Sequence, residues 1–309
     1  MNEAFIVIKE VIILLVLMLI GIASIKLRIM TVELYEGLGK FTISIALPAL
    51  IFRTITTLGG RDVILSSIES VAISVILIAI NFGVGILVAK LSGLRGVKAD
   101  THISATAIGN LGYIGLPIVS ALYSSQGLLV VSIYMIFDVM LNWTIGINMM
   151  DQNKDKSPEE IFMSLVTPLN VTLLISIVLL LLNVTPSGLI FDTIAGIGST
   201  TKYLSIIYLG AKLVTVNFKG AHKEISIYLH ILFKLIAFPV IVYLLGLNFI
   251  DPIILKTFVI IMALPTTTSF PVFANSKGGD EDYSVKITFV GTLVSLITIP
   301  FVVWIITFL

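Results

Sequence analysis

The sequence has no cysteine and little charge. Asp, Glu, Lys and Arg together make up 12% of its 309 residues, whereas soluble proteins carry about 25%. So few charged side chains cannot cover the surface of a soluble domain of this size, which argues against a water-soluble enzyme. The absence of cysteine excludes disulfides, iron–sulfur clusters and a cysteine nucleophile.

Basic residues and histidines are also scarce. A net charge of +1 leaves no basic excess to meet phosphates, so no nucleic-acid partner is expected. The three histidines, His102, His222 and His230, are too scattered to form a metal-spaced pair, and no metal site is predicted. The metalloprotease motif and the phosphate-binding loop are missing. We therefore predict that the protein is not an enzyme and that any pumping draws on an ion or substrate gradient.

Apolar residues, by contrast, make up 57% of the chain. A helix that spans a bilayer needs about 20 of them in succession. Ten apolar segments meet this need, over residues 4–25, 34–58, 67–91, 103–124, 126–149, 161–182, 189–216, 224–247, 253–274 and 284–308. The sequence therefore predicts an all-α integral protein of the cell membrane, with ten transmembrane helices and the lipid bilayer as its surroundings.

The most charged stretch, DQNKDKSPEE at residues 151–160, divides the ten segments into five and five. Because five is odd, the second group enters the membrane with the opposite orientation, as in the inverted repeats of many secondary transporters. We therefore expect a first five-helix repeat over 1–150, a connector over 151–160, and a second, inverted repeat over 161–309.

Lysine and arginine predict the orientation. Thirteen of them lie in or beside the loops on the side of residues 151–160, and five lie on the other side. Since basic residues gather in cytoplasmic loops, the connector is expected in the cytoplasm and both termini outside.

The fourth segment of each half is interrupted near its centre. Residues 103–124 contain Gly109, Gly112, Gly115 and Pro117, and residues 253–274 contain Pro265 and Pro271 around three threonines and a serine. Glycine costs up to about 1 kcal/mol and proline about 3 kcal/mol inside a helix, so both segments should unwind. Unwound backbone is tolerated at membrane depth only where it is buried or lines a cavity. A matched pair of broken helices indicates a transporter binding site, although two independent proline kinks would give the same pattern.

At these residues the sequence resembles the auxin efflux carrier family, in particular its prokaryotic branch. The resemblance rests on GNLGYIGLP at Gly109–Pro117, on ALP at Ala263–Pro265, and on PVFA at Pro271–Ala274. ALPALIF at Ala46–Phe52 and GAKL at Gly210–Leu213 support it. The motifs occur in the order typical of the family, and the resemblance covers nearly the whole chain.

The resemblance implies a sodium/proton-antiporter-like fold of two five-helix inverted repeats, in which the fourth and ninth segments cross at the membrane centre. It further implies that segments three to five and eight to ten form a moving transport domain, and that the first, second, sixth and seventh form a scaffold. Asn110 would lie beside a bound carboxylate, and the substrates would be small organic anions such as malate or malonate. A homodimer through the scaffold helices is a further expectation.

The two breaks supply the candidate substrate residues. These are Asn110, Gly112, Tyr113, Gly115, Pro117, Pro265, Thr266, Thr267 and Thr268. The Asn110 amide offers two donors and an acceptor without a full charge, and the N-termini of broken helices favour an anion. The alternatives are that the threonine hydroxyls bond to helix carbonyls and that Tyr113 packs at a helix contact.

Two ionisable residues fall near the membrane midplane, where such groups are functional by default. Asp138, with Asn142 one turn further on, is a candidate to bind a coupling proton or sodium ion. Lys234 is a candidate counter-ion and would pair with Asp138 if the two meet. A structural role is the alternative for both residues. No organic cofactor is expected.

The histidines complete the inventory. His102 begins the fourth segment and His222 lies in a loop, so both are expected in solvent, whereas His230 is expected to form a hydrogen bond in the core. Taken together, the sequence predicts a secondary active transporter or facilitator of small organic anions that works by alternating access. The alternatives are sodium/proton exchange, bile-acid-like anion uptake, and a channel.

Overall fold

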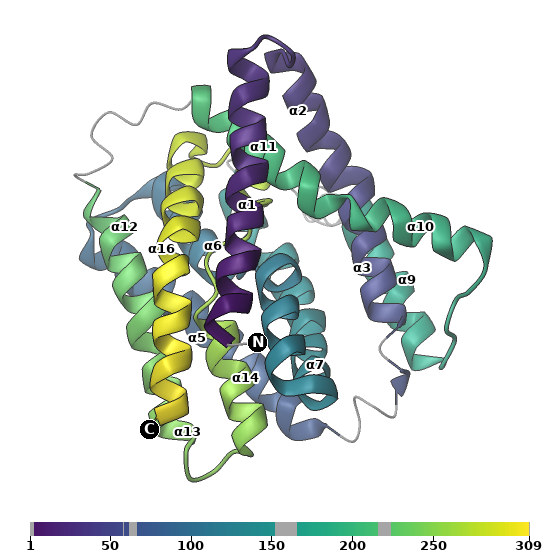
Figure 1. The fold of residues 1–309 in the computed structure, drawn as a ribbon, viewed down its shortest axis with the longest axis vertical. Helices are drawn as coiled ribbons and strands as arrows, with labels where there is room; N and C mark the ends of the chain where they lie inside the picture. Colours follow the sequence, from purple (N-terminus) through teal and green to yellow (C-terminus); the bar gives the residue numbers. More distant parts are fainter. Residues whose placement is uncertain (1–2, 58, 62–66, 152–165, 216–223, 309) are drawn as a thin grey trace.

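The computed structural model describes residues 3–57, 59–61, 67–151, 166–215 and 224–308 (Figure 1). Within these ranges every extended regular element is a helix, and a single isolated β-bridge is present. The predicted all-helical fold is therefore confirmed.

The helices follow the apolar segments of the sequence. The first half contains α1 (Glu3–Lys26), α2 (Val32–Phe41), η1 (Thr42–Ala46), α3 (Leu47–Thr56), α5 (Ile68–Leu91), α6 (Gly96–Ala107), η2 (Leu111–Gly115), α7 (Leu116–Leu141), η3 (Asn142–Gly146) and η4 (Asn148–Met150). The second half contains α9 (Pro168–Leu181), α10 (Leu189–Ser199), α11 (Thr201–Thr215), α12 (Ile225–His230), η6 (Ile231–Ala237), α13 (Phe238–Gly246), α14 (Pro252–Met262), α15 (Phe270–Lys277) and α16 (Glu281–Phe308).

Several helix ends are marked by capping residues. The Thr31 hydroxyl accepts a hydrogen bond from a backbone N–H of the first turn of α2, and Thr167 does the same for α9. The Asp251 carboxylate accepts two such bonds at the start of α14. Gly278, with φ of +74°, ends α15 in the left-handed conformation that glycine adopts without strain.

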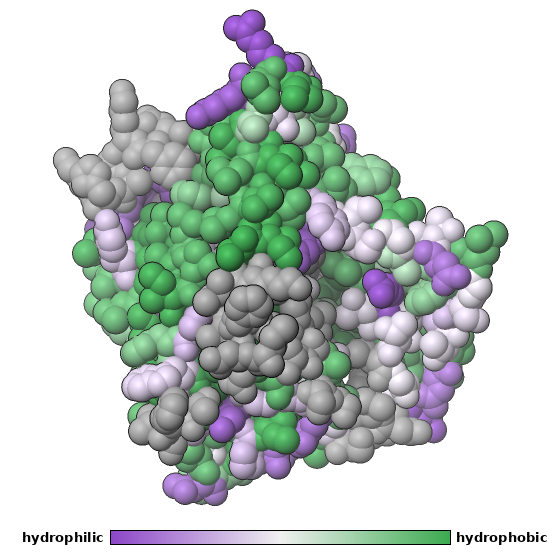
Figure 2. All heavy atoms as spheres, viewed as in Figure 1, coloured by the Kyte–Doolittle hydropathy of each residue, from purple (hydrophilic) through white to green (hydrophobic). Residues whose placement is uncertain are grey.

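Five helical stretches are long and apolar enough to cross a membrane: Val32–Thr56, Ile68–Leu91, Gln126–Met150, Ile225–Gly246 and Glu281–Ile306. Shorter apolar helices cover Ile12–Lys26, Pro168–Leu181 and Pro252–Met262. Their outer faces carry many exposed leucines and isoleucines. Figure 2 shows hydrophobic side chains over much of the face in view, with hydrophilic ones towards its upper and lower ends. Such a surface suits a bilayer.

Helix α7 is not a straight rod. A straight helix of its 26 residues would be about 39 Å long. Gly112, just before it, nevertheless lines the same cavity as Val139 near its end. A Cβ on Gly127 would lie 2.6 Å from the Tyr123 Cβ and 2.8 Å from the Val119 Cγ1. The chain therefore reverses near Gly127, at the start of the fifth apolar segment.

The helices pack in two groups. In one, α1 packs along α11, and α3 packs against α9 and α10. In the other, α5 packs against α6 and α7, α7 against α14, and α13, α14 and α15 against α16. Each group takes helices from both halves of the chain, so neither half forms a separate body (Figure 1).

Two glycines allow α1 and α11 to touch. A Cβ on Gly210 would collide with the Met18 carbonyl oxygen and lie 3.0 Å from the Met18 Cα. A Cβ on Gly21 would collide with the Ile207 carbonyl oxygen and lie 2.9 Å from the Ala211 nitrogen. Backbone against backbone leaves no flexible side chain to move aside, as in the small-residue contacts of membrane helices.

We therefore expect Gly210→Ala to separate α1 from α11 and to destabilise the protein by about 1–3 kcal/mol, the usual cost of overpacking. The measurement is the melting temperature of the purified protein in detergent. Gly83→Ala is the matched control, because a Cβ on Gly83 in α5 meets nothing within 4 Å. Equal melting temperatures for the two variants would show that the contact is not needed.

Candidate substrate site at the helix crossover

Both predicted breaks are present. The helix that begins at Gly96 ends at Ala107, and η2 starts at Leu111 after three non-helical residues. Seven residues separate the end of α14 from the start of α15. The glycines and prolines singled out from the sequence thus interrupt both helices, because each removes a helical hydrogen bond or lowers helix propensity.

The two breaks are hydrogen-bonded to each other. The Asn110 N–H donates to the Pro265 carbonyl oxygen at 2.8 Å, and the Thr267 N–H donates to the Ile108 carbonyl oxygen at 3.3 Å. These bonds form the isolated antiparallel bridge of the molecule's described part. Each unwound segment therefore satisfies backbone groups that the other leaves open, as membrane depth requires.

The Asn110 side chain lies at this bridge. It is 1% exposed, and neither its Nδ2 nor its Oδ1 has a hydrogen-bond partner among the described residues. Its backbone carbonyl accepts from the Ile114 and Gly115 N–H groups, so the backbone is held while the amide is not. A buried amide without partners costs about 1–3 kcal/mol, which makes Asn110 the polar group of the crossover best placed to gain from a ligand.

The hydroxyls of the second break divide into two kinds. The Thr266 Oγ1 donates to the Ala105 carbonyl oxygen at 2.8 Å, and the Ser269 Oγ pairs with that of Ser205 at 2.8 Å. These two tie the break to α6 and α11. Thr267, in contrast, lines a cavity, and the buried Thr268 Oγ1 has no partner in the part of the chain that is described.

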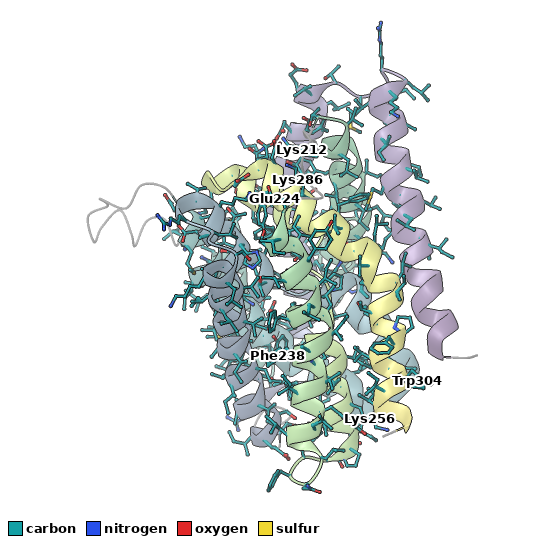
Figure 3. All side chains as sticks on the ribbon, turned by 90° about the vertical axis from the view of Figure 1, so that its left-hand side faces the viewer. Lys212, Glu224, Phe238, Lys256, Lys286 and Trp304 are labelled. Atoms are coloured by element: carbon teal, nitrogen blue, oxygen red, sulfur yellow. The ribbon has the colours of Figure 1, made fainter. Side chains whose placement is uncertain are left out.

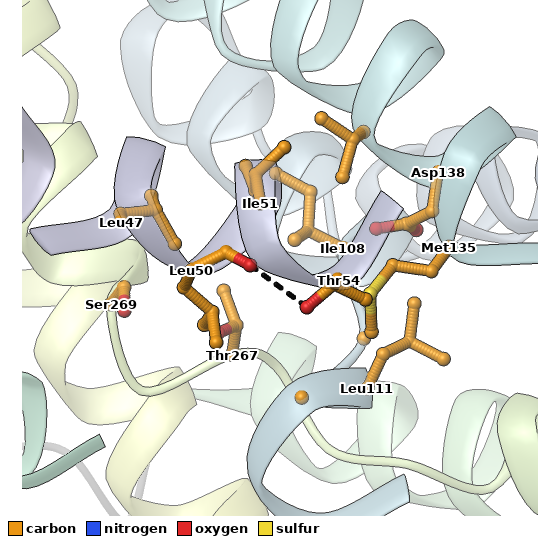
Figure 4. A pocket seen from close by; sticks show the side chains of 13 residues that line it. Leu47, Leu50, Ile51, Thr54, Ile108, Leu111, Met135, Asp138, Thr267 and Ser269 are labelled. Atoms are coloured by element: carbon orange, nitrogen blue, oxygen red, sulfur yellow. Dashed lines mark hydrogen bonds between the residues drawn. The ribbon is translucent and has the colours of Figure 1, made fainter. Parts of the chain in front are cut away.

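A cavity of about 80 Å³ lies beside the crossover. Its lining comprises Leu47, Leu50, Ile51, Thr54, Ile108, Gly109, Leu111, Gly112, Met135, Asp138, Val139, Thr267 and Ser269. Figure 4 shows Asp138 and Met135 on one side and Thr267 and Ser269 on the other. The Thr54 hydroxyl is engaged with the Leu50 carbonyl oxygen at 2.8 Å. The walls are mostly apolar, and Asp138 is the only charged residue among the described residues that line them.

The sequence analysis did not predict that α3 forms one wall of the cavity. Leu47, Leu50 and Ile51 belong to the ALPALIF motif, which supported only the family resemblance. A proline in the middle of an apolar segment was the available signal. It could not show that this helix faces the crossover.

The remaining predicted substrate residues lie at or near the crossover. Gly112 lines the cavity. Gly115 packs on the second break, since a Cβ there would lie 2.8 Å from the Leu264 Cδ1. Tyr113 lies in η2 and Pro117 at the start of α7, and their side chains lie outside the described residues.

Asp138 and Asn142 are adjacent, as their spacing predicts. The Asn142 Nδ2 donates to the Asp138 Oδ1 at 2.7 Å and to the Ala107 carbonyl oxygen at 3.1 Å. Asp138 is 3% exposed and Asn142 is fully buried. One amide therefore fixes the carboxylate against the last residue of α6, immediately before the first break.

Lys234 does not pair with Asp138 in the described part of the chain. Its Nζ donates instead to the Asn81 Oδ1 at 2.9 Å, and the Asn81 Nδ2 donates to the Tyr134 hydroxyl at 3.3 Å. Tyr134 lies one turn before Asp138 on α7. Lys234 thus donates its hydrogen bond to Asn81, a lone amide in an apolar segment that the sequence analysis overlooked. Lys234 and Asp138 interact electrostatically, without an ion pair among the described residues.

The prediction for His102 was wrong. The side chain is fully buried and its Nδ1 lies 2.7 Å from the Tyr283 hydroxyl. The reason is that α6 begins at Gly96, so His102 lies well inside a packed helix rather than at its exposed start. The core hydrogen bond expected of His230 is confirmed by the Thr106 hydroxyl at 3.0 Å. His222 lies outside the described residues.

A charged cluster joins the two helix groups at one end of the molecule. Lys212 on α11 forms ion pairs with Glu36 on α2, at 2.6 Å, and with Glu281 on α16. Glu36 also accepts a hydrogen bond from Asn275 on α15 at 2.7 Å. The Lys212 Nζ lies 5.3 Å above the Tyr35 ring. The cluster therefore adds to the Ser205–Ser269 contact, which joins α11 to the residue just before α15 at the crossover.

The whole chain was compared with known proteins. Residues 6–303 match the model of a family described as membrane transport protein. No curated protein matches the chain. The match spans nearly the entire sequence and confirms the resemblance drawn from the motifs of the two breaks.

Proposed function

The chain belongs to the membrane transport protein family, and from this premise we propose that it is a secondary carrier of small organic anions that works by alternating access. The observation that carries the proposal is the Asn110 amide, which is buried and unpartnered among the described residues, beside two hydrogen-bonded helix breaks. A carboxylate is a suitable partner for such a donor, because hydrogen bonds to charged groups are the stronger ones.

The surroundings favour an anion held by neutral groups. The buried Thr268 hydroxyl and the N-terminus of α15 lie in the same break as Pro265. Helix N-termini stabilise negative charge. The cavity beside this break is small and its lining is mostly apolar, which favours a carboxylate of few carbon atoms over a bulky one.

An anion can bind beside Asp138 only if the negative charge of this carboxylate is neutralised. An ionised carboxylate in the wall would repel an anionic substrate strongly, because charges interact more strongly in a low-dielectric site than in water. A proton or a sodium ion on Asp138 removes the repulsion. We therefore propose that the anion is carried together with one of these cations, with Asn142 holding the carboxylate in place.

A second candidate function is sodium/proton exchange. It is favoured by Asp138, which is the charged residue of the cavity lining among the described residues. The neighbouring Asn142 adds an amide oxygen that has no hydrogen-bond partner among the same residues. Oxygen ligands of this kind suit a hard cation. In that case the cavity holds a cation alone and Asn110 is structural.

For the architecture we propose ten membrane crossings in two inverted repeats, over 1–150 and 161–309, joined by 151–160. The packing supports this arrangement. The first segment packs on the seventh, as α1 on α11, and the sixth packs on the second, as α9 on α3. An inverted repeat relates these two pairs to each other. The group that contains them then forms the scaffold, and the group around the crossover forms the transport domain.

The Lys212 cluster supports alternating access between these groups. It joins α2 and α11 of the scaffold to α15 and α16 of the transport domain. For that end of the carrier to open, these contacts must break. The two carboxylates are partly exposed, Glu36 at 34% and Glu281 at 38%, whereas the Lys212 side chain is 7% exposed and gains solvent only when the contacts break.

The proposed function is tested by a ligand-stabilisation screen of the purified protein with mono- and dicarboxylates, each with and without sodium. A ligand that binds the folded state raises the melting temperature with its concentration. We expect small dicarboxylates such as malonate to do so in the wild type, and in Asn110→Ala only at about ten- to a hundredfold higher concentration. Stabilisation by sodium alone, unchanged in Asn110→Ala, would favour the exchanger instead. Saturable uptake and counterflow distinguish a carrier from a channel.

The topology gives a separate prediction. Thirteen basic residues against five place the connector 151–160 in the cytoplasm and both termini outside. Figure 1 shows the start of α1 and the end of α16 in the lower half of the view, which fits termini on one side. A reporter that is active only in the cytoplasm should be silent at the C-terminus and active when inserted within 151–160. The reverse pattern would invert the orientation.

A further inference from the structure

A cleft lies between the two helix groups at the end of the molecule that carries Lys212. It holds a cavity of about 450 Å³ between α2, η1 and α15, and a second one of about 210 Å³ between η1, η4, α15 and the start of α9. Ile43, Ser44 and Ser276 line both cavities, so the two adjoin and are together called the vestibule. Figure 3 shows Lys212 towards this end and Lys256 towards the opposite one. Because η4 and α9 flank the connector in the sequence, the vestibule lies on the connector side.

A wall about one helical turn thick separates the vestibule from the cavity beside the crossover. On one side of the cleft, Ile43 lines the vestibule and Leu47 lines the cavity. On the other side, Phe273 lines the vestibule and Ser269 lines the cavity. Both pairs are four positions apart, which corresponds to about 6 Å along a helix. Leu47 and Phe273 are buried, so apolar side chains close the wall in this structure.

The two sides of the wall belong to different helix groups. η1 and α3 lie on the side of α9, and α15 lies on the side of α16. The sides touch closely, since a Cβ on Gly39 in α2 would lie 3.3 Å from the Val272 Cγ1 in α15. η1 is π-helical, and such single turns are frequent at functional sites. A shift of one group against the other therefore separates the two sides of the wall.

The lining of the vestibule carries an excess of positive charge. Among the described residues its charged members are Lys40, Lys277 and Glu36. The Glu36 carboxylate is paired with Lys212 at 2.6 Å. The Lys277 Nζ donates to the neutral Asn148 Oδ1 at 3.0 Å, and Lys40 is exposed. A cleft that is lined by one sign of charge between low-dielectric walls concentrates ions of the opposite sign.

We propose that the vestibule collects small anions from the connector side of the membrane and delivers them to the cavity beside the crossover. Small carboxylates are the ligand class, because lysine ammonium groups attract them and the hydroxyls and amides of the lining offer neutral hydrogen-bond donors. Collection follows from the charge of the lining alone. Delivery rests on the proposed function, in which the cavity holds a carboxylate.

The absence of cysteine allows collection to be tested without substrate. Ser44→Cys places a single thiol in the lining. Its rates of reaction with two membrane-impermeant methanethiosulfonates, one carrying a sulfonate and one a trimethylammonium group, are measured in low salt, each relative to the rate of a free thiol. We expect the anionic reagent to react faster on this scale, and from the connector side.

Removal of either lysine should lower this preference. For a charge about 7 Å away in water, Coulomb's law gives a change of about five- to tenfold in the ratio of the two rates. We therefore expect Lys40→Gln and Lys277→Gln, each combined with Ser44→Cys, to lower the ratio by about this factor. Lys256→Gln is the matched control, because Lys256 lies at the opposite end of the molecule (Figure 3) and should leave the ratio unchanged.

A ratio equal to that of the free thiol, or one that neither lysine substitution changes, would show that the lining does not attract anions and would overturn the proposal. Ser276→Cys serves as the second probe if Ser44→Cys does not fold, because Ser276 lines the same two cavities. Asn248→Cys, exposed in the turn after α13, controls for sidedness and should react from the opposite side of the membrane.

Delivery is tested by blocking the vestibule. Complete reaction of Ser44→Cys with a bulky maleimide from the connector side should abolish malonate transport, whereas the same treatment of the wild type, which has no thiol, should change nothing. Wild-type transport by the fully modified variant would overturn delivery. If the unmodified carrier does not transport malonate, the proposed substrate fails and delivery fails with it, while the ratio of the two reagents still decides collection.

Discussion

Replacing Asn110 by alanine should reduce substrate affinity about ten- to a hundredfold while the protein still folds. The site loses the amide that faces the substrate carboxylate, and a hydrogen bond to a charged group is worth about 1.5–3 kcal/mol. Folding should change little, because the amide makes no hydrogen bond among the described residues and its removal breaks none there. Affinity is measured by the concentration dependence of ligand stabilisation and of uptake into proteoliposomes.

Asn248→Ala is the matched control, since Asn248 is exposed in the turn after α13. It should leave both affinity and melting temperature unchanged. A well-folded Asn110→Ala protein with wild-type affinity would remove Asn110 from the substrate site and leave it as a residue of the crossover alone.

The second large effect is expected at Asp138. Asp138→Asn keeps the shape of the side chain and can still accept the hydrogen bond from the Asn142 Nδ2 through its own carbonyl oxygen. It cannot take up and release a proton, and it loses the charge that attracts sodium. We expect the variant to lose accumulation driven by a proton or sodium gradient. It should retain exchange of labelled for unlabelled substrate, which needs no net ion movement.

Accumulation and exchange are measured in the same proteoliposomes. Asp192→Asn removes an exposed carboxylate from α10 and serves as the control. Full accumulation by Asp138→Asn under either gradient would refute the ion-binding role and leave Asp138 a structural group. Loss of exchange as well as accumulation would place Asp138 in contact with the substrate itself.

The helix breaks could be predicted because their causes are local. Glycine and proline act on the backbone of their own segment, so GNLGYIGLP marks the first break without knowledge of the fold. The pairing of Asn110 with Pro265 could not be predicted from either segment alone, because it depends on how two distant helices approach each other. The family resemblance supplied that crossing as an expectation.

Among the polar groups behind the cavity, too, one contact could be predicted from the sequence and another could not. Asp138 and Asn142 are four residues apart on one helix, so their contact follows from helical geometry. Lys234 was expected near Asp138 because both lie at similar depth. The two residues do interact electrostatically. Depth along a helix does not say which way a side chain points around it, however, and Lys234 donates its hydrogen bond to the Asn81 amide.

The pairing of the two breaks also has a consequence for biogenesis. Thr266 and Ala105, which are bonded across the crossover, are 161 residues apart. While the first half is inserted into the membrane, the Asn110 N–H and the Ile108 carbonyl have no partner until Pro265 and Thr267 have been synthesised. Unsatisfied backbone groups cost several kcal/mol each in the hydrocarbon region. Until the second half is made, the first half should therefore remain incompletely unwound or partly hydrated at this break, and it should be open to membrane quality control. A chain that ends within the connector should be degraded unless the second half is supplied as a separate chain.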